Sequence, residues 1–193
     1  MAKVSLGTRR VFSNLKAALF TPWTDFKTLG EDVYDLVDIV ADTTSVEQAE
    51  NEINTIEHEF TSAPLFENVN LGEKTFSTEC VDLQNDVLKA MFGWDVTEAG
   101  DAFAPVGYED LYCKVELHFN STEDIMVLPK VKLNSRAVIA SMKTDVSRAN
   151  ITGTCYPAYV TVGGKTKNTD MAIIASANKE AYTVAGEGEE TEA

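Results

Sequence analysis

Residue types that support catalysis are few and scattered in this chain of 193 residues. It has two histidines, His58 and His118, and no Gly-x-Ser-x-Gly segment, so no motif assembles a Ser–His–Asp or Cys–His nucleophile. His118 falls on the polar side of an alternating segment, where we expect an ordinary exposed imidazole. Among 31 acidic residues some lie close together in any fold, so paired carboxylates carry no signal. We therefore predict no catalytic residue and no enzyme activity.

One short segment resembles the end of a phosphate-binding loop. Gly164-Lys165-Thr166 matches the last three positions of that motif, but the motif also needs a glycine five positions before Gly164, where this chain has Tyr159. Gly163-Gly164 is instead typical of a tight hairpin turn. We expect no nucleotide site here.

The metal-binding residue types also lack the required spacing. Four aspartates follow one another at intervals of three or four residues, without the Asp-x-Asp-x-Asp-Gly pattern that surrounds calcium, and a solvated acidic strand or rim is the favoured interpretation: Asp32, Asp35, Asp38 and Asp42. The cysteines are odd in number and widely spaced, which predicts buried reduced thiols: Cys80, Cys113 and Cys155. The sequence thus predicts no metal site and no cofactor.

Charge is distributed very unevenly along the chain. Residues 1–30 carry a net charge of +4, residues 31–110 carry −18, and residues 111–193 carry −1, for a total of −15. An acidic protein disfavours stable contact with nucleic-acid phosphates, because such contacts use Lys or Arg. A basic segment joined to an acidic body is attracted to the body of a neighbouring copy, which suggests head-to-tail self-assembly. Acidity that serves only solubility is the simpler alternative.

No segment predicts export or membrane insertion. The apolar run 17–20 is too short for a signal peptide, and no run approaches the roughly 18 apolar residues that cross a bilayer. The glycosylation sequons at Asn120 and Asn150 therefore carry little weight.

Hydrophobic patterning predicts a chain composed mainly of strands. Alternation or short β-branched runs indicate strands over 33–41, 74–80, 111–119, 126–133, 136–143, 151–162 and 171–176. Pro129 makes 126–133 an edge strand or a bulged strand. One helix is expected over 82–92, with Asp82 as its cap, a single apolar stripe, and Gly93 as its left-handed end.

The segment 43–65 gives conflicting signals. Ser45 with Gln48 forms a capping box, and Val46, Ile53 and other apolar residues fall near helical spacing. The opposite face of that helix would hold five glutamates without a Lys or Arg to pair with them. We expect a long acidic excursion whose secondary structure stays open.

Three parts follow along the chain. Residues 1–30 mix glycine, proline and scattered aromatics and are expected to form an extended arm, residues 31–185 form the folded β domain, and residues 186–193 form a polar C-terminal tail. Whether the arm packs on its own body or on a neighbour is left open by the sequence.

This order of elements resembles the major tail tube proteins of long-tailed, siphovirus-like bacteriophages. The resemblance covers most of residues 31–180 and includes Leu36-Val37-Asp38-Ile39-Val40-Ala41, Asp82-Leu83-Gln84-Asn85-Asp86-Val87-Leu88 and Pro129-Lys130-Val131-Lys132-Leu133-Asn134. It implies a two-sheet β-sandwich or barrel of the tail-tube type with one flanking α-helix.

The resemblance also implies a function. Subunits of that family form stacked hexameric rings that line a channel for phage DNA, without specific DNA binding. The implied partners are further copies and tail terminator, tape-measure and baseplate-type proteins. The implied place is the virion tail, assembled in the bacterial host cytoplasm, with no membrane.

Roles within the tube follow from the same resemblance. The segment 43–65 would be a ring-contact loop, residues 1–30 a stacking arm, and Glu116 a residue that points into the channel. An acidic lumen would repel DNA phosphates at short range. Deletion of residues 1–25 would then leave a folded subunit that forms no long tubes.

Two other classes of protein fit the same profile. A capsid decoration or head–tail joining protein would share the acidic, strand-rich chain and would differ in the symmetry of its assembly. An enzyme or small-ligand binder on a β-sandwich would need a pocket with perturbed carboxylates.

Overall fold

The computed structural model describes residues 12–36, 38–57, 64–81, 84–107, 110–138 and 147–186. The described chain is mainly β with one α-helix, which confirms the predicted fold class. Its elements are β1 (Leu15–Pro22), β2 (Tyr34–Asp35), β3 (Ser45–Gln48), β4 (Glu52–Glu57), β5 (Pro64–Asn70), β6 (Lys74–Cys80), α1 (Asn85–Phe92), β7 (Asp95–Val96), β8 (Ala102–Phe103), β9 (Leu111–Phe119), β10 (Thr122–Leu133), β11 (Arg136–Val138), β12 (Arg148–Tyr156), β13 (Ala158–Val162), β14 (Lys165–Thr169), β15 (Ala172–Ile174), the 3-10 helix η1 (Ser176–Asn178) and β16 (Thr183–Ala185).

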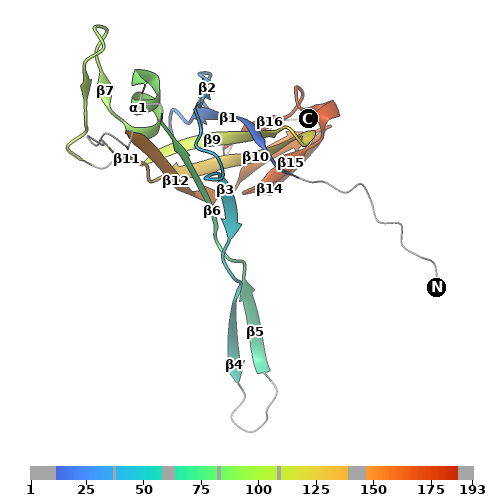
Figure 1. Cartoon of the computed structure of the whole chain (residues 1–193). Coiled ribbons are helices and arrows are strands. Elements are labelled where there is room, and N and C mark those ends of the chain that lie inside the picture. Colours follow the sequence, from blue (N-terminus) through green and yellow to red (C-terminus); the bar gives the residue numbers. More distant parts are fainter. Residues whose placement is uncertain are drawn as a thin grey trace.

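One large antiparallel sheet forms the body of the molecule (Figure 1). Its strands follow the order β2-β1-β9-β10-β12-β6-β3, with β11 beside β12 and β15 beside β10. The predicted alternation of 111–119 is confirmed, because β9 buries Cys113, Val115 and Leu117 on one face.

The large sheet rolls up on itself. Phe20 on β1 and Phe76 on β6 stand four places apart in the strand order, which in a flat sheet would separate them by roughly 19 Å. Their ring centroids are 6.0 Å apart, in an edge-to-face arrangement. The inner face therefore encloses one core, and the sheet is a partly closed barrel.

The segment 34–46 closes the seam between the two ends of the rolled sheet. The Leu36 N–H donates to the Ala18 carbonyl on β1 at 3.0 Å, and the Val40 N–H donates to the Glu79 carbonyl on β6 at 2.8 Å. The strand predicted over 33–41 is thus reduced to β2 and one bridge, Ile39 to Cys80. Asp38 and Asp42 have positive φ angles of 56° and 61°, which interrupt a continuous strand.

β10 is bent at Pro129 and shared between two partners. Residues 125–127 pair with β15, and residues 130–133 pair with β12. The register with β9 shifts between Leu128 and Val131, so the bulge predicted from Pro129 is confirmed, although the strand is central rather than an edge.

A second layer covers the outer face of the barrel near β10. The three-stranded sheet β14-β13-β16 packs there around Ile125, Val127, Val160 and Ile174. The predicted Gly163-Gly164 turn is confirmed: Val162 pairs with Lys165, and both glycines have positive φ.

Helix α1 flanks the core, as predicted. Val87, Leu88, Ala90 and Met91 are its buried side chains, and Gly93 ends it at φ 67°. Gln84 occupies the N-cap, and the predicted cap Asp82 lies outside the described residues.

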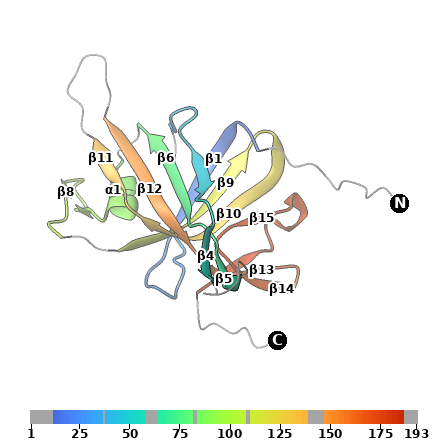
Figure 2. The same cartoon turned by 90° about the horizontal axis from the view of Figure 1, so that it is seen from below.

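The segment 43–65 is part of a β ribbon and not a helix. β3 pairs with β6, and the chain continues into the separate two-stranded sheet β4–β5, which projects far from the body (Figure 1) and is seen end-on in Figure 2. Gly72 lies against the Ala49 carbonyl, where a Cβ would collide. The secondary structure that the sequence left open is therefore β, and the capping-box signal at Ser45 does not start a helix. Residues 58–63 lie outside the described residues.

The prediction of an extended arm over 1–30 is wrong for residues 15–22, which form β1 of the large sheet. β1 lies between β2 and β9 in the large sheet, and Ala18 and Phe20 are fully buried. Trp23, also buried, donates from Nε1 to the Pro129 carbonyl at 3.2 Å. The part of the chain before Phe12 lies outside the described residues.

Other boundaries differ less. The run 151–162 is divided at Pro157 into β12 and β13, and 171–176 contains β15 followed by η1. Of 136–143 the described part is β11, and of the tail 186–193 only Gly186 is described. The three cysteines are free and buried, as predicted. Within the described residues, no helix is long and apolar enough to span a membrane.

We predict that deletion of residues 1–25 prevents folding, because it removes β1, exposes the hydrogen-bonding edge of β9 and takes Ala18 and Phe20 out of the core. Thermal unfolding followed by near-UV circular dichroism checks this. Deletion of residues 2–11 is the matched control and should keep the melting temperature within about 3 °C, which is at most about 1 kcal/mol for a domain of this size. A cooperative, full-length-like transition after removal of 1–25 would contradict the assignment of β1.

Candidate functional site

The structure does not gather the residues that were weighed for catalysis or metal binding. His118 lies on β9, whereas His58 falls outside the described residues. Lys165 and Thr166 belong to the β13–β14 hairpin. Among the described residues no group of three or more His, Cys, Asp or Glu side chains is placed to hold a metal ion. We therefore looked for a site among the polar and apolar surfaces of the barrel.

A row of charged side chains lies on the outer face of β9. The Lys114 ammonium is 2.6 Å from Glu116 Oε1, and His118 Nε2 is 3.5 Å from Glu116 Oε2. The Glu116 side chain is only 14% exposed. It lies between β9 and the second layer, with Tyr182 beside the carboxylate, and its place in a channel stays a prediction.

The pKa shifts of Glu116 and Tyr182 show which groups in this row interact. Burial alone would raise the pKa of Glu116, but the hydrogen bond and the charge of Lys114, together with the nearby Tyr182 hydroxyl, hold it below its ordinary value. Burial first, and the neighbouring carboxylate second, raise the pKa of Tyr182. The Lys114 ammonium also lies 5.6 Å from the centre of the Tyr182 ring. Glu116 thus stays ionised and joins β9 to the second layer.

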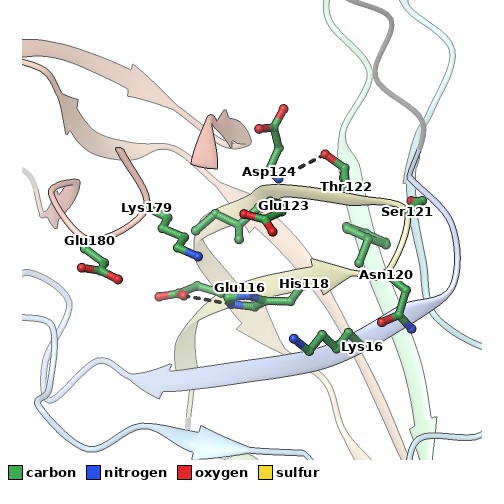
Figure 3. Close-up of a pocket in the computed structure, with 12 residues that line it drawn as sticks. Lys16, Glu116, His118, Asn120, Ser121, Thr122, Glu123, Asp124, Lys179 and Glu180 are labelled. Atoms are coloured by element: carbon green, nitrogen blue, oxygen red, sulfur yellow. Dashed lines mark hydrogen bonds and ion pairs between the residues drawn. The ribbon is translucent and has the colours of Figure 1, made fainter. Parts of the chain in front are cut away.

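A polar cavity of about 550 Å³ opens beside this row (Figure 3). Its walls are the ends of β1, β9 and β10, the turn 120–121, and residues 179–180 that follow η1. Lys16, Lys179 and His118 face it together with Glu123, Asp124 and Glu180. His118 is therefore a half-exposed cavity residue and not the freely exposed imidazole that was predicted. Mixed charge of this kind suits a polar protein contact and defines no single ligand.

The loop 23–30 is fixed to the barrel by a buried lysine. Lys130 is 3% exposed, donates to the Phe26 carbonyl, and lies 3.1 Å from the centre of the Phe26 ring. The rings of Trp23 and Tyr112 lie at 5.0 and 5.2 Å from its ammonium. This cluster attaches residues 23–30 to the body by cation–π contacts, and sequence reasoning missed it because the partners are 104 residues apart.

The ribbon β4–β5 projects from the body of the molecule (Figure 1). β4 and β5 pair with each other in a sheet of their own. Val69 and Leu71 near its base are 48% and 76% exposed, and the segment that leads into the ribbon carries three exposed glutamates: Glu47, Glu50 and Glu52. A lone two-stranded ribbon is marginally stable in water at best, so this element is suited to contact with another molecule.

A groove of about 970 Å³ runs along the seam at one mouth of the barrel. Residues 12–16 form one wall, residues 35–36, 38–42 and 44–46 form the other, and the ends of β9 and β10 form the floor. Several floor and wall residues are apolar members of the core that stay only partly buried: Leu15, Ile39, Val46, Phe119 and Met126. Asp35, Asp38 and Asp42 stand exposed at its rim. The sequence predicted an acidic rim, but only the curvature of the sheet brings these aspartates beside apolar residues.

We predict that Glu116→Gln lowers the free energy of unfolding by about 2 kcal/mol at pH 7, because it deprives the largely buried Lys114 ammonium of its carboxylate. Since the folded-state pKa of Glu116 is lowered, its stabilisation is present above the ordinary value of 4.5 and is lost as the pH falls through the lower folded value. Thermal melts from pH 3 to 8 check this.

The matched control for that measurement is Glu123→Gln, an exposed glutamate on the adjacent β10. It should change stability by less than about 0.5 kcal/mol at every pH. An equal, pH-independent effect of both substitutions would contradict the assigned role of Glu116.

Comparison with known proteins gives little help. No protein-family model matches the chain, and no curated protein matches it. Among solved structures, it is similar to a chain of the anti-feeding prophage baseplate, determined by cryo-electron microscopy with six-fold symmetry applied. The sequences are 10% identical, the match covers 89% of this chain and 99% of that chain, and the TM-score is 0.41. At that TM-score the likeness carries no argument about what this protein does.

Proposed function

We propose that this protein is a structural, non-enzymatic subunit of a phage-tail-like virion, and that its copies associate into hexameric rings that stack into a tail tube. The observation that carries the proposal is the projecting ribbon β4–β5. It forms a sheet separate from the barrel, and exposed apolar side chains stand at its base. Such an element gains stability by packing on another subunit.

The charge of the chain supports the same function. A net charge of −15 on each copy disfavours retention of nucleic acid, because no excess of Lys or Arg is available for phosphate contacts. A channel built from acidic subunits lets DNA pass without holding it. The sequence resemblance to tail tube proteins points in the same direction.

We expect purified protein to form rings with a central channel, and stacks of rings at higher concentration. Negative-stain electron microscopy across a concentration series, with light scattering for mass, measures this. Open-ended stacks support the tail-tube function. Closed particles, or monomers that bind capsids instead, would favour a decoration or head–tail joining protein.

A second prediction concerns the ribbon. Replacement of residues 49–73 by Asn-Gly joins Gln48 to Lys74, which already pair across β3 and β6. We expect the shortened protein to melt within about 3 °C of the full chain and to form no stacks. The matched control, Gly163-Gly164→Asn-Gly, changes another exposed turn and should assemble normally. Normal stacking of the shortened protein would contradict a role for the ribbon.

A further inference from the structure

We propose that the seam groove binds the basic N-terminal segment, residues 1–11, of a neighbouring copy. The inference rests on the proposed self-assembly, but it names one contact that can be tested whether or not rings form. The groove supplies an apolar floor and an acidic rim, and the segment supplies the complementary residue types.

The floor of the groove is an incompletely covered part of the main core. Val46 and Met126 pack against the buried cluster and yet keep part of their surface exposed. Apolar surface of this kind gains free energy when another chain covers it. The groove, with its volume of about 970 Å³, has room for several residues of an extended segment.

The acidic rim of the groove favours a basic segment as its partner. Asp35, Asp38 and Asp42 line the groove and are exposed. Residues 1–11 contain three basic residues and no acid, and they also contain apolar side chains that fit the floor: Lys3, Arg9, Arg10, Val4, Leu6 and Val11. Opposite charges on the two partners raise the association rate and select this segment over acidic ones.

The geometry of residues 12–15 favours a neighbour's segment over the chain's own. Phe12 packs edge-to-face on Phe119 with ring centroids 5.1 Å apart, and the Ser13 N–H donates to Ser121 Oγ at 2.8 Å. The chain thus enters the described structure at the β9–β10 turn and runs inward as one wall of the groove. A segment attached at that end must reverse at once to enter the groove, whereas one from another copy approaches freely.

Two of the rim acids also serve the backbone. Asp38 and Asp42 have left-handed φ angles, which aspartate and asparagine adopt more readily than most residues. Substitution by asparagine therefore removes the charge and keeps the preferred backbone. This makes Asp35→Asn/Asp38→Asn/Asp42→Asn a variant that changes the rim charge alone.

The experiment is thiol cross-linking between two differently tagged full-length copies. One copy carries Leu6→Cys and the other carries Ala41→Cys, an exposed alanine in the groove wall. The matched control is Ala99→Cys, an exposed alanine in the β7–β8 hairpin. The native cysteines are buried, so a short bismaleimide joins the introduced thiols.

We expect at least about tenfold more cross-linked heterodimer with Ala41→Cys than with Ala99→Cys, since docking raises the local concentration of the two thiols. The asparagine variant of the rim, Arg9→Gln/Arg10→Gln, and high salt should each lower the yield by roughly two- to tenfold. Asp95→Asn/Glu98→Gln, which removes exposed acids far from the groove, should leave it unchanged.

Two results would overturn the inference. One is equal cross-linking at positions 41 and 99. The other is a product that forms within a single chain that carries both Leu6→Cys and Ala41→Cys, because it would place the segment in its own groove. Specific cross-linking without rings in the microscope would support this contact and count against the tail-tube function. Rings without specific cross-linking would support the tail-tube function and overturn this contact.

Discussion

Closure of the large sheet is the constraint on which the rest of the structure depends. Phe20 and Phe76 come from strands four places apart, so their contact fixes the curvature and the enclosed core. The roll leaves a seam that residues 34–46 must cross, and the left-handed Asp38 and Asp42 allow the chain to turn there. At one mouth, the described walls of the groove leave apolar floor residues only partly buried.

The rolled sheet also explains why charge is distributed unevenly along the sequence. Residues 111–193, nearly neutral, supply β9, β10 and β12 at the centre of the rolled sheet and the whole second layer. Residues 31–110, with a charge of −18, supply the seam, the ribbon, α1 and the β7–β8 hairpin. Burial of unpaired charge is costly, so the acids collect on peripheral elements. Glu116 is tolerated between the layers only because Lys114 lies against it.

The local pattern of apolar and polar residues predicted the elements that have one apolar face and one polar face. Strand 111–119 and the helix that ends at Gly93 have one core face and one wetter face, and both were found. β1 was missed because Ala17-Ala18-Leu19-Phe20 has no clear alternation in a strand that packs between β2 and β9. Glu116 was taken for a solvent-facing residue because a strand's polar side says nothing of a second layer that packs on it. The groove could not be predicted, because it forms only when the sheet rolls up, and no local sequence pattern encodes that curvature.

The distribution of charge also constrains how identical copies can meet. In a two-fold contact each surface faces its own equivalent, so an acidic ribbon or rim would oppose the same acids of the partner. A head-to-tail contact instead places an acidic surface of one copy against a different surface of the next. The exposed Lys165 and Lys167 lie on β14, an element other than the ribbon and the seam. Repulsion between acidic copies is screened beyond about 10 Å at 0.1 M salt, so short-range complementary contacts decide the geometry. Head-to-tail contacts of this kind are the ones that the proposed rings and stacks require.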